Sequence, residues 1–439
     1  MQVDYNEEEN CLLALKNLKQ VCEMNNATLL RIGLDTLMDK LSSMDSTNAS
    51  DDYAGWSVNL VKLILRWLPI QYRYLALLAS LEDLDTSRRK CPDKSISTPK
   101  QELILTIVEG MLTQDESLIG LNVIDVLNTL ISKVAIQLTV KPSTQTDVVQ
   151  KLVNCIIGLS RHIYYTDQIR DICNAIMDWS RPLYQALLPV GGKTTPAQED
   201  EEDTQSSLDV KTAAIWSLRA LKGILLKGGG SVPFDELWTA TEGALAGREG
   251  EVRMCYIECL ITHLRSEDEG QEDDSQSVAR FLSMIHVPTF LVLKRSEASA
   301  SDYLAIWVLL AALVGRFAEQ EVIKGLPMMW RLLEVTGEKL SRERRACVDG
   351  IFLGYLSVIS DVCKISNLKT AVTKVSSMMF WTDGRKSNSA RLWTNGRHSL
   401  IRLLIPPQLP SMIHYPLTSS FHLPRNNHTP YHLTFNDPR

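Results

Sequence analysis

The sequence predicts an all-α protein in which pairs of helices stack into an α-solenoid. Apolar residues recur at the spacing i, i+3, i+4 and i+7 along most of the chain. No run of alternating apolar and polar residues marks a strand. Tight helix–turn–helix units follow one another, and such units bury a core by packing on their neighbours. This pattern favours a binding surface over a catalytic pocket.

The segment around Pro69 shows one helix pair. Before and after it, apolar residues fall at helical spacing: Trp56, Leu60, Ile64 and Trp67, then Leu75, Leu78, Leu81 and Leu84. Proline lacks an N–H and disfavours helical backbone in the preceding residue, so we expect the first helix to stop at Leu68. Pro69 also suits the first turn of the next helix. Both tryptophans are expected to be core anchors.

Further apolar stripes predict a succession of helices. They lie within 11–22, 30–41, 104–111, 118–134, 152–159, 169–179, 210–225, 252–260, 303–314 and 351–362. Thr166 and Ser341 precede two of these helices and suit N-caps. Residues 303–315 are uncharged and predict a core helix, because no window reaches the ~20 apolar residues that cross a bilayer.

Polar connections interrupt the stripes. Residues 45–53, 86–99, 191–206 and 266–277 are rich in charge and predict disordered loops, because they bury too little apolar surface to offset ordering. The composition changes after about residue 378, where arginine, proline and histidine become frequent. We therefore expect a solenoid over 1–378 and a basic, irregular tail over 379–439.

Composition excludes several function classes. The net charge of −6 disfavours general nucleic-acid binding. The first residues are acidic, whereas a secretion signal begins with basic and apolar residues. Nine cysteines without regular spacing favour reduced thiols in a cytosolic protein.

Fragments of active-site motifs fail on spacing. Gly192-Lys193-Thr194 lacks the first glycine of a phosphate loop, because position 187 is leucine. Gly158-Leu159-Ser160 lacks the closing glycine of a hydrolase elbow. Cys255, Cys259 and His263 share a helix face but make only three of zinc's four usual ligands, so core packing is favoured. We expect no catalytic residue, no cofactor, no metal site and no enzymatic activity.

One loop offers a candidate site. Arg88, Arg89, Lys90 and Lys94 form a basic cluster. Each basic residue near an anionic leaflet contributes ~1 kcal/mol, so this cluster suits contact with acidic lipid. A solvated linker explains the same residues equally well.

Several segments, taken in order, are similar to landmarks of one family. They are Trp67-x-Pro69-x-Gln71-x-Arg73 after the stripe from Trp56, the segment 119–126, the segment 162–169 with Tyr164, Asp167 and Gln168, Arg219-Ala220-Leu221-Lys222, the helix 252–265, and Gly325-Leu326-Pro327-Met328. Across about residues 12–375, the chain resembles the fungal branch of the plasma-membrane anchor family for phosphatidylinositol 4-kinase, called the Rolling blackout family in animals.

The resemblance implies an armadillo/HEAT-like superhelix without catalytic residues. It implies a scaffold on the cytoplasmic face of the plasma membrane that recruits a lipid kinase through a linker subunit of tetratricopeptide type, supporting phosphatidylinositol 4-phosphate synthesis. The family's N-terminal membrane-binding region has no counterpart here, which suggests a truncated or mis-spliced gene model and a chain that is cytosolic by itself. The alternative is a soluble helical-repeat adaptor in trafficking or transport without lipid contact.

Overall fold

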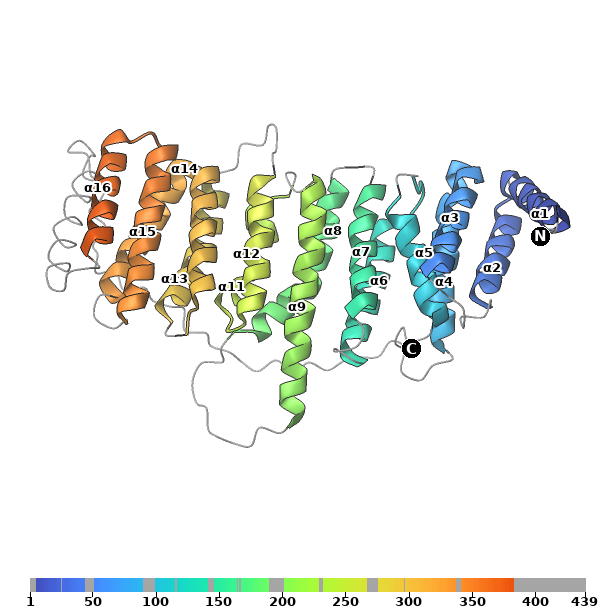
Figure 1. Ribbon diagram of the computed structural model, residues 1–439, viewed down its shortest axis with the longest axis horizontal. Coiled ribbons are helices and arrows are strands. Elements are labelled where there is room, and N and C mark those ends of the chain that lie inside the picture. The colour runs from blue at the N-terminus through green and yellow to red at the C-terminus, as the bar shows by residue number, and fades with distance from the viewer. Residues whose placement is uncertain are drawn as a thin grey trace. The chain divides into compact units, whose positions relative to one another are not determined.

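The computed structural model describes residues 5–24, 26–43, 51–89, 99–114, 117–140, 146–163, 165, 167–188, 201–228, 232–266, 275–295, 297–336 and 341–382. The regular elements of these residues are helices, and no strand occurs among them (Figure 1). The predicted all-α helical-repeat class is therefore confirmed.

The helices follow the predicted stripes closely. In chain order they are α1 (Tyr5–Glu23), α2 (Ala27–Ser43), α3 (Asp51–Trp67), α4 (Arg73–Arg89), α5 (Pro99–Leu112), α6 (Val123–Val140), α7 (Thr146–Leu159), α8 (Asp167–Ala186), α9 (Glu201–Gly228), α10 (Phe234–Leu237), α11 (Glu242–Ala246), α12 (Gly250–Arg265), α13 (Ser275–Lys294), α14 (Ala300–Thr336), α15 (Arg342–Val362) and α16 (Ser366–Thr382). Two short 3₁₀ turns, Ile70–Tyr72 and Ser160–His162, follow α3 and α7.

The chain divides into two compact units, Met1–Lys364 and Ile365–Arg439. In the first unit, the helices α1, α3, α5, α7, α9, α12 and α14 each pack against the next in that order (Figure 1). A second row contains α2 packed on α4, and then α6, α8, α11 and α13. The core of this unit lies between the two rows. The second unit contains α16.

The break at Pro69 has the predicted position. Helix α3 ends at Trp67, and the N–H of Leu68 still donates to the Ile64 carbonyl at 2.9 Å. Pro69 has φ −53° and ψ 139°, which is extended backbone, and a 3₁₀ turn follows it before α4 begins at Arg73. The prediction that Pro69 lies in the first turn of the next α-helix is therefore wrong, because this extra turn separates them.

The buried face of α3 differs from the predicted stripe. Val61, Ile64, Leu65 and Leu68 are at most 4% exposed and follow the spacing i, i+3, i+4 and i+7. Trp56 is 53% exposed, so the prediction that it is a core anchor is wrong. Trp67 is half-buried. The tryptophans flank a face that is formed by the smaller apolar residues.

The helices also extend into the connections that the sequence predicts to be disordered. Helix α3 begins at Asp51, α4 runs to Arg89, α9 begins at Glu201 and α13 begins at Ser275. Acidic residues in a first turn compensate the positive end of the helix dipole, so a charged segment is compatible with a helix start. The rest of these connections lies outside the described residues. The predicted tail, 379–439, lies outside the described residues from 383 onward. Helix α16 runs to Thr382 and therefore crosses the predicted boundary at residue 378.

Two helices are longer and more apolar than the sequence reading allowed. Ser275–Lys294 and Ala300–Val335 each contain an 18-residue window, with mean hydropathies of 1.3 and 1.5, whose length and composition would suit a membrane span. The prediction that no segment is apolar enough to cross a bilayer is wrong, because a few charged residues leave the mean hydropathy of these windows high. Half of each window is buried among other helices. Ile306, Leu309 and Leu313 are fully buried, which confirms the predicted core helix.

Helix α14 is bent at Ala318, whose φ of 40° and ψ of −109° are not helical. A positive φ costs an alanine of order 1–3 kcal/mol, so surrounding contacts must hold this conformation. The start of α15 is simpler. The Ser341 side chain accepts a hydrogen bond from the Arg344 N–H at 3.5 Å, which confirms the predicted N-cap.

Candidate functional site

The basic cluster is only partly described. Arg88 and Arg89 are the last two residues of α4. The placement of their side chains lies outside what the structure describes. Lys90 and Lys94 lie outside the described residues. Contact with anionic lipid therefore stays a prediction.

The family landmarks near Pro69 and at the start of α8 lie at helix ends. Gln71 is exposed in the 3₁₀ turn after Pro69. Asp167 is the exposed first residue of α8, and the Gln168 N–H donates to the Tyr165 carbonyl at 3.0 Å. Tyr164 and Thr166 lie outside the described residues. These landmarks position helices and do not form a pocket.

The segment 119–126 encodes a turn and a helix cap. Gly120 has φ +90°, which favours glycine, and a Cβ there would lie 3.4 Å from the ring of Tyr74. Asn122 precedes α6, and its side-chain oxygen accepts a weak hydrogen bond from the Asp125 N–H at 3.4 Å. The Asn122 amide in turn donates to the Asp125 carboxylate at 2.5 Å. Gly120 and Asn122 therefore determine how the chain enters α6.

The last landmark lies beside a buried polar cluster. Glu321 of α14 is fully buried and contacts His286 of α13 and Tyr355 of α15. The His286 Nε2 lies 3.0 Å from Glu321 Oε1, and the Tyr355 hydroxyl donates to the same oxygen at 3.0 Å. Burial, followed by the charge of Glu321, raises the pKa of Tyr355. A Cβ at Gly325 would collide with these side chains, so this glycine is needed for the cluster, whereas Pro327 is exposed.

Of the three residues considered as metal ligands, Cys259 and His263 lie in the core and Cys255 is half-buried. His263 accepts a hydrogen bond from Trp238 Nε1 at its Nδ1, over 2.9 Å, and its Nε2 donates to the Val232 carbonyl over 3.0 Å. Both ring nitrogens are therefore occupied. Cys259 is fully buried, and burial raises the pKa of its thiol. In the described part of the chain, no group of histidine, cysteine and acidic residues has the geometry of a metal site.

The motif fragments are also structural where they are described. Ser160 donates to the Ile157 carbonyl at 2.6 Å, and the His162 Nε2 lies 3.0 Å from the Leu112 carbonyl oxygen. Both residues are buried at the end of α7. Residues 192–194 lie outside the described residues. In the part of these motifs that the structure describes, both polar side chains are therefore bonded to backbone carbonyls.

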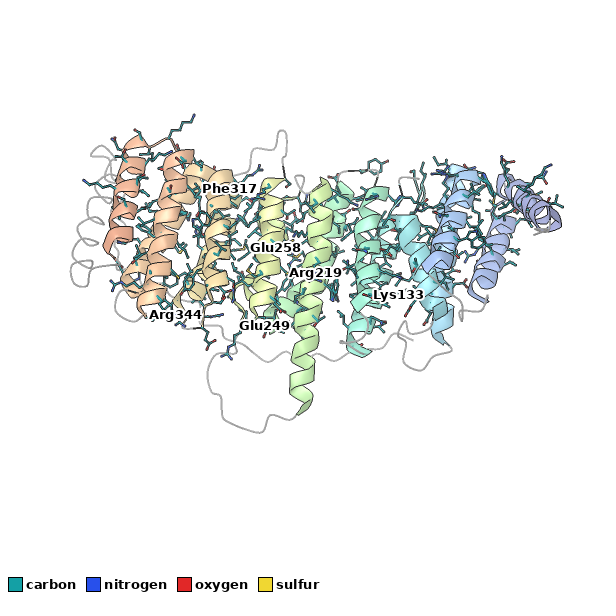
Figure 2. All side chains as sticks on the ribbon, viewed as in Figure 1. Lys133, Arg219, Glu249, Glu258, Phe317 and Arg344 are labelled. Carbon is teal, nitrogen blue, oxygen red and sulfur yellow. The ribbon has the colours of Figure 1, made fainter. Side chains whose placement is uncertain are left out.

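Ion pairs link α9 to α12 on the surface of the first unit. Lys211 lies 3.3 Å from Glu249 and 2.9 Å from Glu251, and Lys222 lies 2.8 Å from Glu258. Arg219 lies over the ring of Trp216 at 4.7 Å. Figure 2 labels Arg219 of α9, Glu258 of α12 and Glu249, which directly precedes α12. Exposed pairs of this kind contribute about 0–1 kcal/mol each, so they guide helix pairing more than they stabilise it.

The sequence does not reveal a deeply buried ion pair. Arg253 of α12 and Asp302 of α14 are each 5% exposed, with Nε 2.8 Å from Oδ1. Arg253 also donates to the Gly247 carbonyl at 2.7 Å, and Arg295 donates to the same oxygen at 2.9 Å. Asp302 accepts from the N–H and the hydroxyl of Ser299, both at 2.9 Å. This network joins the end of α11 to α12, α13 and α14.

The polar groups described here are therefore engaged in helix packing, and the candidate functional site is the surface of the stacked helices. An apolar cavity between α6, α7, α8 and α9 is lined by residues that include Ile131, Ile156, Ile176 and Trp216. Because its lining is almost wholly apolar, it lacks the convergent polar groups that orient a ligand.

Comparisons with known proteins agree with the resemblance seen in the sequence. The family model described as "EFR3 protein" matches residues 1–181. The relatives include Protein EFR3 of Chaetomium globosum, 23% identical over 86% of this chain and 40% of that protein, and Protein EFR3 of Gibberella zeae, 23% identical over 86% and 42%. Protein EFR3 of Pyricularia oryzae is 25% identical over 88% of this chain and 41% of its own length.

The chain thus spans about two fifths of the length of these curated relatives. No solved structure matches it. The resemblance to the fungal EFR3 family is confirmed.

Proposed function

We propose that this chain, which is related to the fungal EFR3 proteins, is a non-enzymatic scaffold that helps to localise a phosphatidylinositol 4-kinase complex to the plasma membrane. In this role it supports the synthesis of phosphatidylinositol 4-phosphate. The observation that carries the proposal is the match to EFR3 proteins over 85–88% of the chain, on a framework of stacked helices. Stacked helix pairs offer extended surfaces for protein partners.

The chemistry of the described residues supports a scaffold over an enzyme. The residues that imitate active-site motifs, Ser160 and His162, are buried and bonded to backbone carbonyls. The partners in this proposal are a linker subunit of tetratricopeptide type and, through it, the lipid kinase. The location is the cytoplasmic face of the plasma membrane, with anionic lipid as a further contact.

Relocation of the chain tests this proposal. In a fungal cell lacking its own EFR3 protein, the full chain is fused to a lipid-anchored tag that places it at the plasma membrane. We expect a fluorescent phosphatidylinositol 4-kinase to move to the membrane with it, and the same tag without the chain to leave the kinase in the cytosol. If the kinase stays in the cytosol while the tagged chain is at the membrane, the chain does not recruit it. A soluble trafficking adaptor would give that result.

Direct lipid contact is a separate prediction. We expect the untagged, unacylated chain to float only weakly with phosphatidylserine vesicles at ~0.15 M salt, where charges act over ~8 Å. A net charge of −6 opposes an anionic surface, and stable anchoring normally needs two membrane signals. Replacing Arg88, Arg89, Lys90 and Lys94 by glutamate is expected to abolish the remaining flotation.

The control makes the same change in charge elsewhere. Lys324, Arg331, Arg345 and Lys369 are exposed, and their replacement by glutamate is expected to lower flotation less than the first set. Equal losses in the two variants would show that net charge matters and the basic cluster does not. Tight, salt-resistant flotation of the parent would show a second membrane site.

A further inference from the structure

Three turns of the first unit lie along one edge of the row of helices. Helices α3, α5 and α7 pack against one another in that order (Figure 1). Lys151 donates a hydrogen bond to the Thr106 hydroxyl at 2.8 Å, and Arg161 donates to the Thr113 carbonyl beyond the helix ends. Helices α5 and α7 are therefore parallel, and the turns that follow them lie at the same edge.

Each of these turns exposes one large apolar side chain. They are Ile70 (45% exposed) after α3, Ile119 (40%) after α5 and Tyr165 (71%) after α7. A Cβ at Gly120 would contact the ring of Tyr74 at the start of α4, so the turns after α3 and α5 adjoin. Helices α3, α5 and α7 each have neighbours on both sides, so this edge lies within the row and not at its end. Exposed apolar side chains gathered on one surface are typical of a contact with another molecule.

A buried amide lies in the middle of this edge. Gln114 follows the end of α5 and is 8% exposed. Within the described part of the chain, neither its amide nitrogen nor its amide oxygen has a hydrogen-bond partner. An unpaired buried amide destabilises the free chain, so rotation of this side chain toward a bound molecule that pairs with it is favourable. The edge therefore combines apolar contacts with an unused donor and acceptor.

The spacing of the three apolar side chains selects the shape of an occupant. Packed helices lie ~8–10 Å apart, so we expect Ile70, Ile119 and Tyr165 at about this interval. In polyproline II, every third residue lies on the same face, and three residues rise ~9 Å. Residues on one face of a β-strand repeat every ~7 Å, which does not match. Seven residues of an α-helix rise ~10 Å, but their carbonyls are already bonded within the helix and leave no acceptor for Gln114.

We propose that this edge binds a polyproline II segment of a partner protein that carries apolar side chains at every third position. These side chains pack on Ile70, Ile119 and Tyr165, and the Gln114 amide donates to a backbone carbonyl of the segment. Polyproline II has no internal hydrogen bonds, so its carbonyls are free to accept, and its stiffness reduces the entropy lost on binding. This site is independent of the role proposed above in localising a lipid kinase.

Fluorescence anisotropy with synthetic peptides tests the proposal. The probes are labelled nine-residue peptides that repeat Leu-Pro-Pro, Ile-Pro-Pro or Tyr-Pro-Pro three times, and each is titrated with the full chain. At least one is expected to bind with a dissociation constant below about 200 µM. The matched peptide that repeats Ala-Pro-Pro has the same backbone conformation and is expected not to bind, because it lacks the large apolar side chains.

The variant Gln114→Leu separates binding from folding. Leucine has a similar size and no polar atoms, so the melting temperature is expected to equal or exceed that of the parent. The affinity for the peptide is expected to fall about fivefold, because the hydrogen bond to the segment is lost. A purely structural role of Gln114 would leave peptide binding unchanged.

The apolar contacts are tested by truncation. Tyr165→Ala and Ile119→Ala are each expected to weaken peptide binding about five- to tenfold with little change in melting temperature, because both side chains are exposed in the free chain. Leu304→Ala is the matched control. Leu304 is 62% exposed on α14, outside this edge, and its variant is expected to bind the peptide as the parent does.

Four results would overturn the proposal. The first is that none of the three apolar peptides binds. The second is tighter binding of an alanine-based helical peptide with leucines seven residues apart. The third is parental affinity in both Gln114→Leu and Tyr165→Ala. The fourth is a Tyr165→Ala variant that loses vesicle flotation and keeps peptide binding, which would assign this edge to a membrane.

Discussion

Replacing Arg253 by alanine is expected to lower the free energy of unfolding by about 3–5 kcal/mol. The change leaves the carboxylate of Asp302 buried without its charged partner, and loss of one member of a buried ion pair costs this much. The Gly247 carbonyl also loses one of its two arginine donors. Urea denaturation followed by far-ultraviolet circular dichroism measures the effect.

A matched arginine separates burial from charge. Arg280 pairs with Asp235 at 3.0 Å, but its side chain is 65% exposed. Exposed pairs contribute about 0–1 kcal/mol, so Arg280→Ala is expected to change the free energy of unfolding by no more than this. If Arg253→Ala and Arg280→Ala cost the same, the buried network does not join the helices as described.

The Arg253–Asp302 pair also gives stability a pH dependence of definite sign. Burial alone would raise the pKa of Asp302, but hydrogen bonds from Arg253 and Ser299 outweigh it and hold the pKa below its ordinary value. A depressed pKa stabilises the fold above the unfolded value of ~4, and this contribution is lost as pH falls through the folded value. The stability difference between the parent and Arg253→Ala should therefore narrow in acid.

The sequence predicted helices well where an apolar stripe was long. In α15, the predicted residues Ile351, Tyr355 and Ile359 are at most 5% exposed, whereas the fourth predicted residue, Val362 at the helix end, is 38% exposed. Periodicity is reliable there because the apolar positions of several successive turns lie on the same buried face. In α3 the predicted face includes the two tryptophans, whereas the buried face includes Val61 and Leu65. The prediction is therefore rotated about the helix axis, because it takes the large tryptophans as the buried residues. Size suggests burial, but spacing determines it.

Short or interrupted helices were missed. Helices α10 and α11 have four and five residues, which is too few to show a period. Helix α13 contains Pro288, and an interior proline normally argues against a helix. Phe281, Leu282 and Ile285 are nevertheless buried there, so tertiary packing outweighs the local penalty. Periodicity alone cannot supply that information.

The buried polar clusters were beyond sequence reasoning for a different reason. Arg253 and Asp302 are 49 residues apart, and no spacing rule joins two helices at that separation. One local signal was present. Ser299 and Asp302 form a capping box, in which the Asp302 N–H donates to the Ser299 hydroxyl oxygen at 3.2 Å and the Ser299 N–H to the Asp302 carboxylate. That motif marks a helix start and leaves one carboxylate oxygen for Arg253.

The close approach of α8 and α11 gives the second large effect. A Cβ on Gly243 would lie 2.6 Å from the carbonyl carbon of Tyr184 and nearer still to its oxygen, closer than Cβ atoms approach in real structures. The Tyr184 carbonyl accepts a hydrogen bond from the Leu187 N–H at 3.2 Å at the end of α8. The obstacle is backbone in a bonded turn, so it cannot rotate away as a side chain would.

Gly243→Ala is therefore expected to lower the free energy of unfolding by about 3 kcal/mol, the upper end for overpacking a close-packed interior. Gly350→Ala is the control with opposite sign. No heavy atom lies within 4 Å of a Cβ at Gly350, which is exposed in the middle of α15, so alanine there should stabilise the helix by ~0.5–1 kcal/mol. Urea denaturation of both variants compares the two signs directly. If Gly243→Ala is as stable as the parent, α11 does not approach α8 as closely as the structure places it, and the contact between these helices tolerates a side chain.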